Sequence, residues 1–175
     1  AAVVLAMILL TAPLHWLLGF DAYTLILTAH AVLGTALVVV ATIAASMGYR
    51  LAIHHLPSFG WLMGMASAAA ALAGTLAVLG NILYAGYLRS GGPMEQLIKK
   101  APEAHKVLFE FKEYVGLFPF PLAVASAFIV WFYREDLRRD RQLAEMVATL
   151  LLLVVFFSLL PFGLGAAVVR LRGIL

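Results

Sequence analysis

A histidine lies inside one of the long apolar stretches of the chain, at residues 22–47. His30 is followed four residues later by Gly34, so the two share a face if the stretch is helical. An imidazole removed from water needs a hydrogen-bond partner or a metal, and a glycine beside it would make room for a flat macrocycle. His30 is therefore a candidate ligand of the iron of a b-type haem, a candidate contact of a quinone, or a histidine bonded to a neighbouring helix.

A haem held by two histidines needs a second one at similar depth, and the sequence offers two partners for His30. His105 precedes the fourth apolar segment and lies too far out if that segment runs straight, although Pro119 and Pro121 could bend it. His15, in the first apolar segment, matches His30 better in depth. Neither pair forms a sequence motif.

Other polar side chains fall at the level of His30 when about 20 residues are counted across each apolar segment. They are Asn81 and Tyr84 on the third segment, and Lys112 and Glu113 on the fourth. These groups can donate hydrogen bonds or transfer protons, so we expect them to complete a cofactor site with the histidines. The middle of the membrane contains only threonine and serine as polar residues, which disfavours an ion pathway through the full thickness.

The segment before the fourth apolar run is amphipathic over residues 103–118. Residues 119–133 would extend only about 22 Å as a helix, too short to cross a membrane. The span must therefore begin near Glu113, which places this carboxylate at or just inside the interface and in need of a partner. His30 and Tyr84 are at the right level. Two roles for Glu113 stay open, a polar clamp between helices and a part in binding or proton transfer.

The composition explains why so few polar residues stand out. The chain is 64% hydrophobic and 12% charged, against about 25% charged residues in soluble domains. It contains no cysteine, which excludes disulfides, thiolate metal sites, c-type haem attachment and iron–sulfur ligation. No nucleophile–base pair, phosphate loop or HExxH motif supports a stand-alone hydrolase or transferase.

We expect an all-α integral membrane protein, because backbone groups in lipid must be bonded within their own segment. The predicted fold is an up-and-down antiparallel bundle of four transmembrane helices plus an N-terminal apolar helix, about five spans in all. It forms a single membrane domain over residues 1–175, with no soluble domain. The predicted helices cover about residues 1–20, 22–47, 61–87, 103–133 with a kink near 119–121, and 142–169. The first lacks a basic start and a cleavage site, which argues against a signal peptide.

The charges lie mostly in the connections. The net charge is +3, and basic residues near membrane surfaces fit anionic lipid better than nucleic acid. Four arginines within residues 134–141 favour a cytoplasmic position for that loop. On the third segment, Ala66, Ala70 and Gly74 recur at a spacing of four, which favours close helix packing. Close approach to a flat cofactor is the alternative for this face.

One stretch has a recognisable pattern. Leu83, Tyr84, Tyr87 and Arg89, followed after a loop by Leu108, Phe109, Glu110, Lys112 and Glu113, resemble "LYP-x-(Y/F)-R" and "LF-(D/E)-x-KE-(H/N)" in a group of small multi-span membrane proteins. The group resembles four-helix membrane cytochromes that hold b-type haem, and this resemblance concerns the fold alone. Ala85 stands in place of the proline. Tyr114 stands in place of His or Asn, which weakens the case for a haem ligand there.

These observations predict an integral membrane subunit of an electron-transfer complex of the respiratory type. It would hold a b-type haem or a quinone near one membrane face. The alternative is an accessory subunit without a cofactor that packs against larger partners. In both cases we expect membrane lipid and other membrane subunits as partners, and location in the cell membrane.

Overall fold

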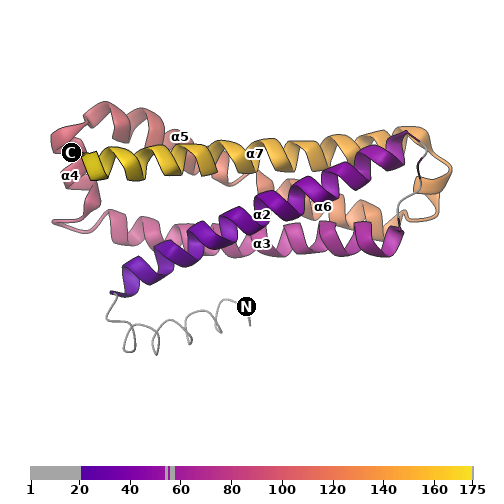
Figure 1. The fold of residues 1–175 in the computed structure, drawn as a ribbon, viewed down its shortest axis with the longest axis horizontal. Coiled ribbons are helices and arrows are strands. Elements are labelled where there is room, and N and C mark those ends of the chain that lie inside the picture. The colour runs from indigo at the N-terminus through magenta and orange to yellow at the C-terminus, as the bar shows by residue number, and fades with distance from the viewer. Residues whose placement is uncertain (1–20, 54, 56–57, 175) are drawn as a thin grey trace.

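The computed structural model describes residues 21–53, 55 and 58–174 (Figure 1). Two short helical turns, η1 and η2, and six α-helices make up this part of the chain. Their bounds are α2 Ala22–Ala52, α3 Phe59–Tyr87, α4 Pro93–Lys100, η1 Ala104–Phe109, α5 Glu110–Gly116, α6 Pro119–Phe132, η2 Asp136–Arg138 and α7 Arg141–Ile174. The expected N-terminal helix over residues 1–20 lies outside the described residues, and so does His15.

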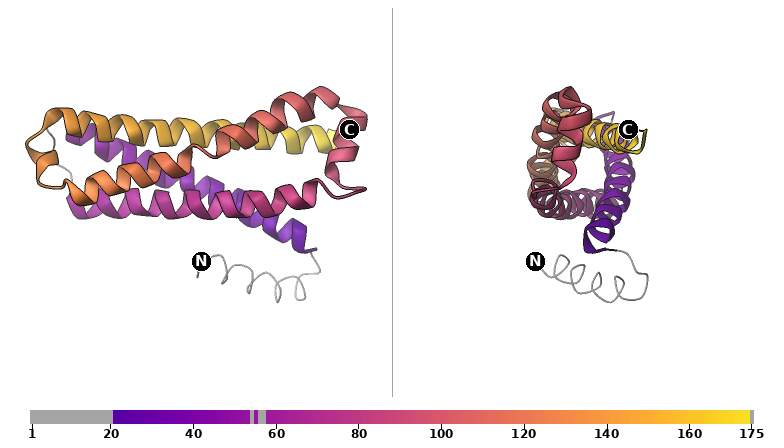
Figure 2. Two further views of the ribbon diagram at one scale, coloured as in Figure 1. Left: turned by 180° about the vertical axis from the view of Figure 1, so that it is seen from behind. Right: turned by 90° about the vertical axis from the view of Figure 1, so that its left-hand side faces the viewer.

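The prediction of an all-α bundle with four span-length apolar helices is confirmed. Within the described residues, four helices are long and apolar enough to cross a membrane: α2, α3, the segment His105–Phe132, and residues Arg141–Val168 of α7. α2 packs on α3 and α7, while α6 packs on the same two helices from the other side. Figure 2 shows this ring around a common axis. The span lengths and apolar surfaces make this a membrane protein.

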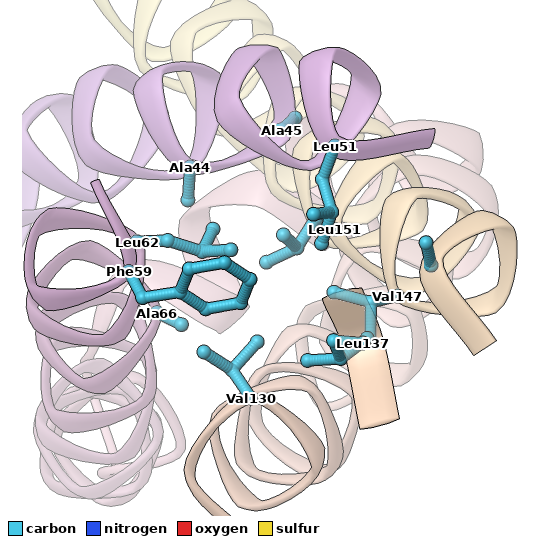
Figure 3. Packing of buried hydrophobic residues seen from close by; sticks show 11 residues of the cluster. Ala44, Ala45, Leu51, Phe59, Leu62, Ala66, Val130, Leu137, Val147 and Leu151 are labelled. Atoms are coloured by element: carbon cyan, nitrogen blue, oxygen red, sulfur yellow. The ribbon is translucent and has the colours of Figure 1, made fainter. Parts of the chain in front are cut away.

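Small residues allow the helices to approach closely at the end that carries the 134–141 loop. The cluster there joins Leu62 of α3, Val130 of α6 and Leu151 of α7, all 0–1% exposed, with Ala44 of α2 (Figure 3). Ala66 is fully buried in the same cluster. The small-residue face of α3 thus packs within the chain.

The fourth span is broken between α5 and α6. Pro119 and Pro121 have no N–H, so they cannot donate hydrogen bonds to the carbonyl oxygens one turn back. Their rings also clash with those carbonyl groups. Leu117 and Phe118 instead make short-range bonds, from the Leu117 N–H to the Tyr114 oxygen (3.3 Å) and from the Phe118 N–H to the Val115 oxygen (3.2 Å). The break turns the span, so that α5 packs on α7 while α6 packs on both α3 and α7. Figure 2, left, shows this oblique course.

Asp21 caps the start of α2 outside the membrane span. Its carboxylate accepts hydrogen bonds from the Thr24 N–H (2.9 Å) and the Thr24 hydroxyl (2.7 Å). The bond from the Thr24 side chain, followed by that from its N–H, lowers the pKa of Asp21 below its ordinary value of 3.8. The cap satisfies one of the backbone donors that a helix start leaves unpaired.

We predict that amide exchange will report this cap. A carboxylate with a lowered native pKa stabilises the folded end above its ordinary pKa, and this contribution is lost as the pH falls through the native value. Protection of the Thr24 amide should therefore decrease on acidification below pH 3.8, measured by hydrogen–deuterium exchange. Asp21→Ala should show the low protection already at neutral pH. Equal protection of the Thr24 amide in the wild-type protein and in Asp21→Ala at neutral pH would contradict the capping role of Asp21.

Candidate functional site

Polar side chains lie between two apolar clusters of the bundle, alongside the buried residues Leu79, Leu83 and Val115. The central cluster of the bundle ends near Leu37 of α2, Leu76 of α3 and Val154 of α7. A separate small cluster begins further out with Tyr87 and Phe109, beneath α4. Between these two clusters lie His30, Lys112 and several glycines. We call this level, defined by His30, Gly80, Lys112, Glu113 and Gly165, the polar layer.

His30 lies on the side of α2 that faces α3. A Cβ atom added to Gly80 of α3 would lie 3.6 Å from the His30 Cε1 atom, an ordinary contact distance, so the ring lies beside Gly80. The Nδ1 atom of His30 is buried and has no hydrogen-bond partner among the described residues. A buried polar atom left unpaired costs about 1–3 kcal/mol, and such an atom calls for an explanation.

The glycine expected to make room beside His30 faces another helix. A Cβ on Gly34 would lie 3.7 Å from the ring of Phe162 of α7. One turn along α2, the helix surface has rotated enough to face α7 instead of α3. The glycine that lies beside the His30 ring is Gly80, on a different helix.

Lys112 enters the polar layer from α5. Its ammonium is 3.2 Å from the Glu113 Oε1 atom and 5.2 Å from the centre of the Phe109 ring. Its methylene chain runs along α7, where a Cβ on Gly165 would lie 3.4 Å from the Lys112 Cε atom. A lysine with its stem against glycine backbone and its charge held inward is placed to donate hydrogen bonds within the bundle.

The partner of Glu113 is therefore its neighbour in sequence. The sequence predicted His30 or Tyr84 as its partner, but the Glu113 carboxylate bonds Lys112. Tyr84 is partly exposed and stacks on Tyr87 and Phe109, with ring centres 6.4 and 6.3 Å apart.

His105 meets Tyr87. The Tyr87 hydroxyl and the His105 Nδ1 atom are 2.8 Å apart, and the His105 Nε2 atom is 4.0 Å from the Glu110 Oε1 atom. Both ring nitrogens thus have polar neighbours without a metal. A haem shared by His30 and His105 would have to displace these contacts.

The remaining expected residue, Asn81, is exposed, and its amide donates to the Ala77 carbonyl oxygen of its own helix (2.8 Å). Asn81 thus follows Gly80 of the polar layer in sequence, but its side chain is exposed and bonds its own helix. The described residues hold no group of three or more His, Cys, Asp or Glu side chains able to bind a metal ion.

Two residues that sequence reasoning did not assign to the site belong beside it. Tyr87 is 4% exposed, and its ring stacks on Phe109 with centres 4.0 Å apart. The available signal was spacing: Tyr87 lies one turn beyond Leu83 and Tyr84 on α3, and Phe109 lies four residues after His105.

Comparison of the chain with protein-family models, with curated proteins and with solved structures gives no match.

Proposed function

We propose that the chain is an integral membrane subunit of an electron-transfer complex and that it binds a quinone headgroup in the polar layer. The observation that carries the proposal is the buried, unpartnered Nδ1 atom of His30. Lys112 supports it, because it is a second hydrogen-bond donor expected at the same level, and its stem lies against Gly165 of α7. A quinone supplies the capacity to accept and release two electrons and two protons.

The residues fit a quinone better than a haem. A quinone headgroup is flat and presents carbonyl oxygens, which accept hydrogen bonds from an imidazole N–H or an ammonium. His30 and Lys112 are groups of these two kinds. Their level near one face of the bundle suits a headgroup whose tail stays in lipid. A haem bound between His30 and His105 would instead need the His105 nitrogens that now face Tyr87 and Glu110.

In this proposal each side chain has a separate task. His30 orients the headgroup through one hydrogen bond from or to its buried Nδ1 atom. Lys112 supplies a second hydrogen bond and favours negative charge that develops on the ligand. Glu113 holds the Lys112 ammonium in position.

The proposal also covers location and partners. We place the protein in the cell membrane with the 134–141 loop on the cytoplasmic side, in line with its arginines. Two strongly exposed aromatic side chains, Phe132 (75%) and Trp131 (70%), lie at the end of α6. Aromatic residues at this depth suit both lipid headgroups and the surface of another membrane subunit.

The second candidate is an accessory subunit without a cofactor. The close packing of Gly48 against Ala148 and Leu151 favours it, because such packing builds a rigid scaffold without any need for a ligand. In that case Lys112, Glu113 and His30 would only hold helices together.

Extraction separates these candidates. The protein should be purified in native lipid, treated with organic solvent, and the extract analysed for quinones, alongside a dithionite-reduced spectrum of the intact protein. We expect a quinone near one equivalent per chain and no α-band of b-type haem, and His30→Ala should lose most of the quinone. A haem band that vanishes in His30→Ala would overturn the quinone assignment, and an extract without either cofactor would favour the accessory subunit.

A further inference from the structure

Two arginines of the 134–141 loop lie over one aromatic ring. The Cζ atom of Arg138 is 5.0 Å from the centre of the Phe59 ring, and that of Arg134 is 6.0 Å from the same centre. Phe59, the first residue of α3, is only 6% exposed, whereas both arginines are exposed. A guanidinium held over a ring keeps its charge near the aromatic face, while its N–H groups stay available for another partner.

The loop that carries these arginines is anchored to the packed end of the bundle. Leu137, which lies between them in sequence, is buried in the same cluster as Phe59 (Figure 3). The Leu137 N–H bonds the Tyr133 carbonyl oxygen (2.9 Å), and the Arg139 N–H bonds the Asp136 carbonyl oxygen (2.9 Å). The two stacked arginines therefore extend from a fixed turn, which reduces the ordering that a ligand would have to impose.

No carboxylate among the described residues forms an ion pair with Arg134 or Arg138. Glu135 and Asp136, their neighbours in the loop, form no ion pair in this part of the chain either. Asp140 instead accepts hydrogen bonds from two N–H groups in the first turn of α7 (2.8 and 3.2 Å). Two like charges near one ring repel each other, so an anion that contacts both arginines would stabilise this arrangement.

The surface at this end of the bundle is rich in exposed aromatic side chains. Both tryptophans in the described part of the chain, Trp61 of α3 and Trp131 of α6, are exposed here. Phe128 and Phe132 of α6 are also exposed, and their rings stack with centres 5.1 Å apart. Exposed tryptophans are typical of the depth at which hydrocarbon meets the lipid headgroups. Positive charge at this depth, near an apolar surface, suits a molecule with acyl chains below a phosphate better than a free anion in water.

We propose that Arg134 and Arg138, stacked on Phe59, bind the headgroup phosphate of an anionic phospholipid. The planar N–H edges of the two guanidinium groups donate charge-assisted hydrogen bonds to the phosphate oxygens. The acyl chains lie along the exposed aromatic side chains of α6. Anionic lipids are enriched in the cytoplasmic leaflet, which is the side where we place this loop.

The lipid site is independent of the proposed quinone site. The 134–141 loop joins α6 to α7 at the end of the bundle where α3 begins, whereas Gly80 of the polar layer lies near the end of α3. Arg134→Gln and Arg138→Gln should therefore leave decylubiquinone binding unchanged. A protein that binds no quinone can still bind the lipid, so the two proposals fail separately.

Native mass spectrometry of the purified protein in nonionic detergent tests the lipid site. Dioleoylphosphatidylglycerol is titrated in about 150 mM ammonium acetate, where the Debye length is about 8 Å and distant charges are screened. We expect one tightly bound equivalent in the wild-type protein. Arg134→Gln and Arg138→Gln should each weaken this binding at least about tenfold, since each removes charge-assisted hydrogen bonds to the phosphate.

Arg139→Gln is the matched control, because it removes the same charge from the same loop but no ring contact. It should weaken binding less than about threefold, since only a screened charge is lost. Dioleoylphosphatidylcholine, whose choline brings a positive charge towards the arginines, should bind weakly. Unchanged binding in Arg134→Gln and Arg138→Gln, or an equal loss in Arg139→Gln, would overturn the site. Displacement of the lipid by millimolar inorganic phosphate would assign the arginines to a soluble anion and overturn the lipid proposal.

Discussion

His30→Leu is expected to stabilise the ligand-free protein and to abolish binding of decylubiquinone. In the wild-type protein the Nδ1 atom of His30 is buried without a partner among the described residues. Leucine has a similar volume and no polar atom, so it should recover the cost of that unpaired group, about 1–3 kcal/mol. A gain in stability together with a loss of binding is the usual mark of a residue retained for function.

Unfolding in mixed detergent micelles would measure the first effect, and a decylubiquinone titration the second. His55→Leu is the matched control, because His55 is exposed in the connection between α2 and α3. It should change neither quantity. If His30 were a clamp between helices, His30→Leu would destabilise the protein, and that result would contradict the ligand-site interpretation.

Gly48→Val should cause the largest loss of stability in the packed half of the bundle. A Cβ at Gly48 would lie 3.2 Å from the Ala148 Cα atom and 3.0 Å from the Leu151 Cδ1 atom. Backbone cannot move aside as a side-chain tip can, so valine would force α2 away from α7. Overpacking of this kind costs about 1–3 kcal/mol, occasionally more.

Gly64→Val on α3 controls for the change in helix propensity, because a Cβ there meets nothing within 4 Å. Valine is a slightly better helix former than glycine, so this variant should be as stable as the wild type or slightly more so. Equal unfolding free energies for Gly48→Val and Gly64→Val would mean that the α2–α7 contact is looser than described.

The sequence predicted the bundle because long apolar segments have only one way to satisfy their backbone in lipid. It also predicts a common level for His30, Lys112 and Glu113, since depth is expected to follow from residue count and helical rise. The break in the fourth span near Pro119 follows from the missing proline N–H groups.

Orientation around each helix axis was harder to predict. Asn81 has the right depth but is exposed, and Gly34 faces Phe162 instead of making room for His30. A nearly uniform apolar helix gives little information about which side faces its neighbours. The Tyr87 hydroxyl of α3 meets His105 of another segment, and residue spacing within one segment does not show which groups of another segment it will meet.

The central claim is that the polar layer around His30 binds a quinone headgroup. Its most direct test is to titrate the purified protein in lipid nanodiscs with decylubiquinone and to measure binding by isothermal calorimetry. We predict saturable binding of one equivalent, retained in His55→Leu and weakened at least about tenfold in Lys112→Met, since one charge-assisted hydrogen bond contributes about 1.5–3 kcal/mol. Binding that is not saturable, or that is unaffected in both His30→Leu and Lys112→Met, would contradict the claim.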